Sequence, residues 1–78
     1  MDISPEVLDM VQPGKAVRLA FPPPNVNNEI RHIRAVVDDE CVVFRVWLKH
    51  KKRWVYRCDD LIYYQILWRE GFLKPLDT

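Results

Sequence analysis

Apolar and polar residues alternate through residues 41–58, CVVFRVWLKHKKRWVYRC, on both sides of a basic stretch. A period of two is typical of β-strands, so this segment predicts a β-hairpin with two different faces. We expect one face to pack into the core, and its residues are Val42, Phe44, Val46, Leu48, Trp54, Tyr56 and Cys58. The other face should be open to solvent or to a ligand, and its residues are Arg45, Trp47, Lys49, Arg53 and Arg57.

The chain before this hairpin predicts one short helix and two strands. Ser4-Pro5-Glu6 is typical of a helix start, with serine as N-cap and proline in the first turn, and Gln12-Pro13-Gly14 ends the helix. Residues 15–21 and 29–37 alternate in hydrophobicity and predict strands. Between them, the prolines 22–24 favour an extended polyproline segment, followed by a polar loop.

A helix is predicted after the hairpin, capped by Asp59 or Asp60 and ended by Gly71. The expected fold class is therefore α+β: a small antiparallel sheet of three to four strands with a C-terminal helix on one face and a short N-terminal helix. The alternative is an SH3-like small barrel. We expect one domain, 1–78, with the N-terminal helix and turn at 1–14, strands at 15–58 and the C-terminal helix at 59–71.

The alternation also predicts which strand residues lie opposite each other, because a one-residue slip would turn the apolar set away from the core. We expect a three-residue loop at residues 49–51 and a two-residue turn at residues 39–40. The resulting opposite pairs are Trp47 with Arg53, Arg34 with Arg45, and His32 with Trp47.

Charge is unevenly distributed, although the net charge is only +1. Residues 31–57 contain eight Lys or Arg against three acidic residues, whereas residues 1–30 and 58–78 each contain two against four. The basic excess therefore lies on the predicted sheet, where a patch of this kind favours a nucleic-acid or other anionic partner.

A tryptophan among these cations predicts a surface that tracks phosphates and stacks a base. An ordinary solvated face, with arginine stems covering apolar surface, explains the same pattern, and the run at residues 49–53 can simply keep a hairpin tip soluble. We take DNA or RNA binding as the first hypothesis. The predicted nucleic-acid-binding residues are His32, Arg34, Arg45, Trp47, Lys49, Lys51, Lys52, Arg53 and Arg57.

The predicted C-terminal helix is apolar around most of its circumference. Such a helix is either deeply buried or at an interface. The second hypothesis is therefore a protein-interaction or inhibitor module that binds a host protein or forms a homodimer. Its predicted interface residues are Tyr63, Tyr64, Leu67 and Trp68.

Catalytic chemistry has no assembled residue set in the sequence. Gly14 and Gly71 are the only glycines, so there is no glycine-rich phosphate loop, and the only serine, Ser4, lies at a helix cap. We therefore predict a binding protein without enzymatic activity, cofactor or small-molecule substrate. No apolar run approaches the ~20 residues of a membrane span, and the acidic N-terminus lacks the features of a signal peptide, which favours the cytoplasm.

A metal site or disulfide is not expected either. Cys41, Cys58, His32 and His50 lack the close spacing of structural zinc ligands. The predicted alternation also sends Cys58 into the core and Cys41 to the other face.

The segment 34–58, RAVVDDECVVFRVWLKHKKRWVYRC, resembles short proteins of bacteriophages, prophages and mobile elements. The resemblance covers about a third of the chain and depends on the acidic turn, the Val-Phe-Arg-Val-Trp strand and Arg-Trp-Val-Tyr. It implies a bacterial or phage cytoplasm and an accessory protein that binds DNA or a host protein. No catalytic or binding residue is carried over from it.

Overall fold

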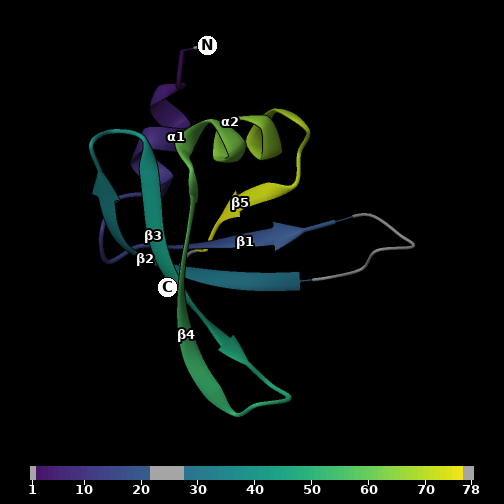
Figure 1. Ribbon diagram of the computed structural model, residues 1–78. Helices are drawn as coiled ribbons and strands as arrows, with labels where there is room; N and C mark the ends of the chain where they lie inside the picture. Colours follow the sequence, from purple (N-terminus) through teal and green to yellow (C-terminus); the bar gives the residue numbers. More distant parts are fainter. Residues whose placement is uncertain (1, 22–27, 77–78) are drawn as a thin grey trace.

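The chain folds as a strongly bent antiparallel sheet with two helices packed on one face (Figure 1). The computed structural model describes residues 2–21 and 28–76. Its elements are α1 (Pro5–Met10), β1 (Ala16–Ala20), β2 (Asn28–Val37), β3 (Cys41–Leu48), β4 (Arg53–Asp60), α2 (Leu61–Arg69) and β5 (Leu73–Pro75). The polyproline segment and the polar loop predicted at residues 22–27 lie outside the described residues.

The small α+β domain with an antiparallel sheet is confirmed, but the sheet has five strands instead of three to four. The strand order is β4-β3-β2-β1-β5, and the unpredicted strand β5 pairs with β1, where Leu73 lies opposite Leu19. Both leucines are buried, so this short strand adds to the core. In the described residues β4 and β5 are the two edges of the sheet and do not pair with each other, which leaves the sheet open.

The core lies between the helices and one face of the sheet, which we call the core face. The buried apolar residues come from both helices and from all strands except β4, and they are Val7, Met10, Val11, Val17, Leu19, Ile33, Val42, Phe44, Val46, Leu61, Tyr64, Leu67 and Leu73. Ser4 at the start of α1 donates from its backbone N–H and its hydroxyl to Gln65 Oε1, at 2.8 and 3.1 Å. This contact ties α1 to α2. Gly71 ends α2 with a φ of +84°, as predicted.

The prediction of which β4 side chains face the core, which we call the phase of the strand, is wrong. Trp47 lies opposite Trp54, and Val46 lies opposite Val55. Residues 49–52 form the hairpin tip, which is one residue longer than expected, and Lys52 adopts a φ of +51° there. The extra residue turns β4 over, because neighbouring side chains of a strand point to opposite faces. The residues expected in the core from this strand, Trp54, Tyr56 and Cys58, are all exposed.

The turn between β2 and β3 is also shifted by one residue. The Glu40 N–H donates to the Val37 carbonyl at 3.0 Å. Asp38 and Asp39 between them both have positive φ, 54° and 53°. These are the features of a type I′ turn, which tolerates aspartate. Val37 pairs with Cys41, so the connection has three residues, 38–40, instead of the two expected. The turn is therefore centred on residues 38–39 instead of 39–40.

A register shift between Ile33 and Ala35 then changes the phase of β2. Such a bulge places Ile33 and Val36, three residues apart, on the same face of the sheet. The expected pairs of Arg34 with Arg45 and of His32 with Trp47 are wrong, because His32 is the residue opposite Arg45.

The corrected phase of β4 makes a prediction about stability. Phe44→Ala should lower the free energy of unfolding by about 3–5 kcal/mol, because it empties a fully buried site. Trp54→Ala should cost only about 1 kcal/mol, since it removes surface aromatic contacts and no core volume. Urea unfolding followed by circular dichroism measures both. Equal losses for the two variants would contradict the placement of Trp54 outside the core.

Candidate nucleic-acid interface

The sheet face opposite the helices carries a cluster of aromatic and basic side chains at the end of the β3–β4 hairpin. Trp47 and Trp54 meet edge to face, with ring centroids 5.4 Å apart, and the His32 ring lies 5.3 Å from Trp54. Arg45 lies over the Trp54 ring, with its guanidinium carbon 4.4 Å from the centroid. Tyr56 lies opposite Arg45 on the same face. We call these five residues the aromatic face.

The rings of the aromatic face remain largely open to solvent. Trp47, Trp54 and Tyr56 are 46%, 42% and 61% exposed, because the helices cover only the other face of the sheet. A monomeric protein rarely leaves several large aromatic side chains together at its surface without a binding role. The correction to β4 therefore enlarges the predicted site, since Trp54 and Tyr56, both assigned to the core, lie on the same face as Trp47.

Arg45 is the central cation of the aromatic face. Its Nε atom is buried and has no hydrogen-bond partner among the described residues. The cation–π contact on this face joins Arg45 and Trp54, not Trp47 and the residue expected opposite it, Arg53. A guanidinium held in this way keeps its charge close to the rings without an acidic partner.

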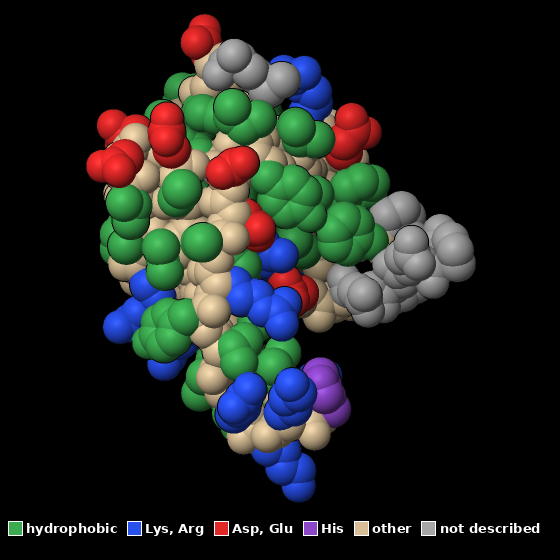
Figure 2. Space-filling model, in the orientation of Figure 1, with side chains coloured by type: hydrophobic (Ala, Val, Ile, Leu, Met, Phe, Trp, Pro, Cys, Tyr) green, Lys and Arg blue, Asp and Glu red, His purple; other side chains and the backbone are tan. Residues whose placement is uncertain are grey.

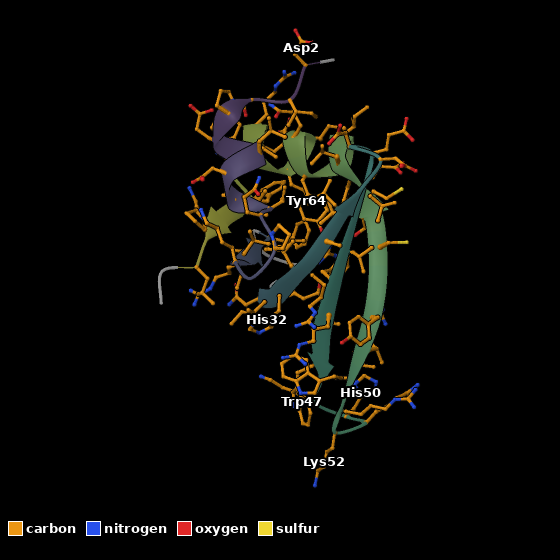
Figure 3. The ribbon with its side chains drawn as sticks, turned by 90° about the vertical axis from the view of Figure 1, so that its left-hand side faces the viewer. Asp2, His32, Trp47, His50, Lys52 and Tyr64 are labelled. Atoms are coloured by element: carbon orange, nitrogen blue, oxygen red, sulfur yellow. The ribbon has the colours of Figure 1, made fainter. Side chains whose placement is uncertain are left out.

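The other predicted basic residues divide into three groups. Lys49, Lys51 and Lys52 are exposed at the hairpin tip, where Figure 3 shows Lys52 at the extremity beyond Trp47 and His50. Arg53 and Arg57 lie opposite Leu48 and Phe44. They are therefore exposed on the reverse side of the hairpin from Trp47. Arg34 is exposed within the register shift of β2.

The surface charge follows the shape of the molecule. Figure 2 shows Lys and Arg side chains gathered over the hairpin end, whereas Asp and Glu side chains gather over the end that carries the helices. This separation agrees with the basic excess of residues 31–57. Such a field orients an anionic ligand toward the hairpin.

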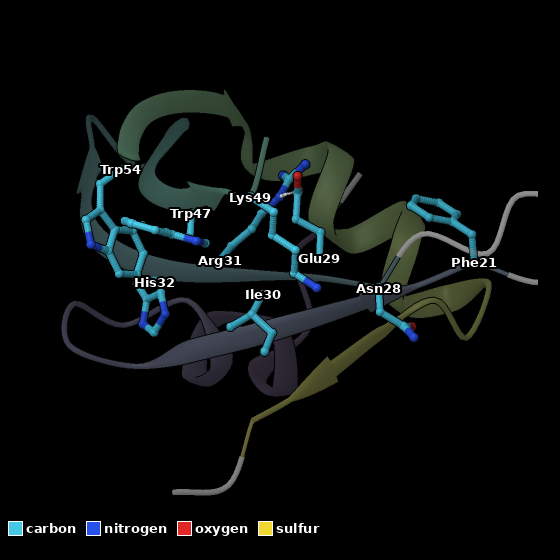
Figure 4. A pocket seen from close by; sticks show the side chains of 9 residues that line it. All are labelled: Phe21, Asn28, Glu29, Ile30, Arg31, His32, Trp47, Lys49 and Trp54. Atoms are coloured by element: carbon cyan, nitrogen blue, oxygen red, sulfur yellow. Dashed lines mark hydrogen bonds and ion pairs between the residues drawn. The ribbon is translucent and has the colours of Figure 1, made fainter. Parts of the chain in front are cut away.

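A cleft of about 920 Å³ adjoins the aromatic face, where β2 and β3 separate (Figure 4). Pairing of these strands ends at His32 and Arg45, so residues 28–31 of β2 pair only with β1 and residues 46–48 of β3 pair only with β4. Figure 1 shows the two hairpins pointing in different directions beyond this point. The residues that line the cleft are Phe21, Asn28, Glu29, Ile30, Arg31, His32, Trp47, Lys49 and Trp54.

Arg31 connects the cleft to the core. Its Nε donates to Glu29 Oε2 at 2.6 Å, and its Nη1 donates to Asp59 Oδ2 at 2.5 Å and to the Tyr64 hydroxyl at 2.9 Å. Its guanidinium carbon lies 4.2 Å from the centroid of Phe44. Burial lowers the pKa of Arg31, but its interactions with Tyr64 and Glu29 outweigh burial and hold that pKa above its usual value.

Of the residues that line the cleft, sequence reasoning predicted His32, Trp47 and Lys49 as binding residues but missed Arg31, Glu29 and the cleft itself. A signal for Glu29 and Arg31 was present, because both have the same parity as the apolar residue Ile33 in the alternating segment 29–37. Side chains two residues apart in a strand share a face, so an arginine at this position must be buried with acidic partners. The partner Asp59 could not be assigned, since it depended on the phase of β4.

The predicted protein-interface residues are separated by the structure. Tyr64 and Leu67 are buried in the protein's own core and cannot contact another chain, which corrects that expectation. Trp68 is half-buried against the core, and Tyr63 is exposed. The apolar residues that α2 leaves exposed are Ile62, Tyr63 and Ile66.

The two cysteines share a face, contrary to the predicted alternation. Cys41 lies opposite Asp60 and Cys58 opposite Val43, so the thiols occupy diagonal positions on β3 and β4. Diagonal Cα atoms lie about 7–8 Å apart, which is too far for a disulfide without backbone movement. Burial and the nearby Asp60 raise the pKa of Cys41, which disfavours a reactive thiolate. Within residues 2–21 and 28–76, no group of three or more His, Cys, Asp or Glu is placed to hold a metal.

Comparisons of the chain with protein-family models, curated proteins and solved structures find no match. No helix in the described part of the chain has the length and apolar character needed to cross a membrane. The case for a function therefore depends on the aromatic face, the hairpin tip and the cleft.

The Arg31 network makes a prediction about alkaline pH. Burial raises the pKa of Tyr64 to about 12, although Arg31 acts in the opposite direction. An unfolded tyrosine has a pKa of about 10. The stability that Tyr64 contributes is thus fully present below pH ~10 and is lost as the pH rises through about 12. Tyr64→Phe should flatten the fall of the unfolding free energy over this range, measured by urea unfolding at each pH. Tyr63→Phe, at an exposed site, is the control and should retain the wild-type fall.

Proposed function

We propose that this protein is a non-enzymatic module that binds single-stranded nucleic acid through the aromatic face and the hairpin tip. The observation that carries the proposal is the placement of three exposed aromatic side chains, Trp47, Trp54 and Tyr56, on one open sheet face beside a run of cations. Stacking platforms flanked by positive charge are the usual means of binding single strands without strong sequence preference.

The geometry favours single strands over duplexes. Rings on an open sheet can stack only with bases whose flat faces are free, and a duplex hides those faces within its own stack. The Trp47 and Trp54 rings meet at 67°, so at most one of them can lie parallel to a given base. Successive bases would therefore stack on different rings of the face.

The cations around the face are suited to the phosphates of the same strand. Lys49, Lys51 and Lys52 extend the face beyond Trp47 at the tip, and Arg45 lies over the Trp54 ring. Since β4 is an edge of the sheet, a sugar-phosphate backbone that passes around this edge also meets Arg53 and Arg57 on the reverse side of the hairpin. Each phosphate that a cation neutralises releases counterions, which makes the affinity dependent on salt.

Charge and stacking should be separable by mutation. Lys51→Ala should weaken binding modestly and lower the slope of log affinity against log salt by about 0.7 for one lost phosphate contact. Trp47→Ala should cost ~1–3 kcal/mol of binding with little change in slope, because stacking releases no counterions. Fluorescence anisotropy of a labelled mixed-sequence DNA or RNA, titrated over a salt series, measures both quantities.

Arg69→Ala is the matched control, because Arg69 is an exposed cation at the end of α2, on the side of the sheet away from the rings. It should leave affinity and slope nearly unchanged. If low-salt titrations with excess single-stranded DNA and RNA give no binding, the proposed function is wrong.

A second candidate function is a homodimer or protein-interaction module that uses α2. The observation in its favour is that Ile62 and Ile66, one helical turn apart, are 48% and 44% exposed with Tyr63 beside them. If these residues form a dimer interface, the melting temperature should rise with protein concentration. Ile66→Glu should abolish that dependence, whereas Ile30→Glu, at an exposed isoleucine of β2, should preserve it. Light scattering that gives a monomer mass at high concentration would contradict the dimer.

A further inference from the structure

One wall of the cleft between β2 and β3 is a main-chain edge of β2 that pairs with no other strand of residues 2–21 and 28–76. The Ile33 N–H donates to the Lys15 carbonyl at 2.8 Å, on the β1 side of β2. Main-chain hydrogen bonds alternate in direction along an antiparallel strand, so Arg31 and Glu29 also bond toward β1. Ile30 therefore directs its N–H and C=O toward the cleft, where β3 has already separated from β2. These two groups can bond the edge of a flat polar ligand.

Beside Ile30, the Glu29 carboxylate is held in a fixed orientation. Its Oε2 accepts from Arg31 Nε at 2.6 Å, and Arg31 is itself held by Asp59 and Tyr64. No donor among the described residues reaches the other oxygen, Oε1, and about a third of the Glu29 side chain is exposed. A carboxylate can only accept hydrogen bonds, so this wall of the cleft selects ligand groups that donate.

The opposite wall supplies a ring and a cation. Trp47 and Trp54 line the cleft at the end nearest the aromatic face, and Lys49 lies between these rings and Glu29 (Figure 4). A flat ligand ring in the cleft can thus contact Trp47 while the polar edge of that ring points toward Glu29. Lys49 is placed to meet an attached phosphate, whereas Glu29 repels one.

We propose that this cleft holds one base of the bound strand and prefers guanine. The inference rests on the proposed function and adds a base preference to it. Guanine alone among the four bases carries two adjacent N–H donors, the ring N1–H and the 2-amino group, on its Watson–Crick edge. Adenine and cytosine place a ring acceptor beside the amine, which a carboxylate disfavours, and thymine or uracil offers one donor flanked by two acceptors.

The test compares an oligothymidylate of eight nucleotides with the same oligomer carrying one central guanine, adenine or cytosine. Fluorescence anisotropy at low salt should show roughly fivefold to tenfold tighter binding of the guanine oligomer than of the other three. In wild-type protein, the Ile30 amide signal in ¹⁵N-resolved NMR spectra should shift more with the guanine oligomer than with oligothymidylate. This second measurement needs no variant to fold.

Glu29→Gln assigns the preference to the carboxylate. The glutamine carbonyl can still accept from Arg31, but the amide NH2 group then takes the place of Oε1. This group donates hydrogen bonds and cannot accept them, so the guanine preference should disappear while oligothymidylate still binds. Asp39→Asn is the matched control: it removes the same charge at the distant, exposed β2–β3 turn and should keep the preference.

The outcomes distinguish the two proposals. Equal binding of all four oligomers by wild-type protein, or a guanine preference that survives Glu29→Gln, overturns this inference and leaves the proposed function standing. An Ile30 signal that does not respond to the guanine oligomer also overturns the cleft as the site. Failure of every oligomer to bind at low salt overturns both.

Discussion

The guanidinium of Arg31, whose side chain is only 11% exposed, makes the interactions on which the arrangement of this domain depends. It lies where β2 and β3 separate, packs on Phe44 and bonds residues of β2, β4 and α2. A buried charge that loses its partners costs several kcal/mol. Asp59 must therefore remain beside β2, which holds the base of the β3–β4 hairpin and the start of α2 against the first hairpin. The floor of the cleft is thus part of the core, while its walls belong to strands that diverge.

The elements that were predicted well are those whose signals are local. Ser4 and Pro5 marked the start of α1, Gly71 marked the end of α2, and the hydrophobic alternation located the four main strands. The core face of β3 followed directly, because its even positions are all apolar whereas Arg45 interrupts its odd positions. Strand β5 was missed since it has three residues and ends in proline, and what stabilises it is the distant pairing with β1.

The errors arose in strands where odd and even positions both carry apolar residues, so that either face could be the core face. In β4, Trp54 and Tyr56 have one parity and Val55 has the other, so hydrophobicity alone favoured the larger aromatic side chains as core. The choice depended on the length of the tip, and no glycine or asparagine there indicates that Lys52 takes a positive φ. The candidate site changed with the phase: Arg53 and Arg57 moved to the reverse side of the hairpin, and two aromatic rings joined Trp47. The cleft could not be predicted at all, because it results from the point at which strand pairing stops.

The core lies at one end of the sheet and the exposed aromatic rings lie at the other. This separation explains how so small a chain can expose so much aromatic surface. The thirteen buried apolar residues of the described chain lie near the helices, and the rings of the aromatic face contribute nothing to that cluster. A domain of this size has only a few kcal/mol of stability, so a binding surface built from core residues would be constrained by folding. Placing Trp47 and the basic tip at the end of a hairpin that projects beyond the helices frees them from this constraint (Figure 3). Arg31 and Glu29 are the exception, because they serve the core and the cleft together. The two proposals therefore require that a change at either position alters stability as well as binding, whereas changes at the tip need alter only binding.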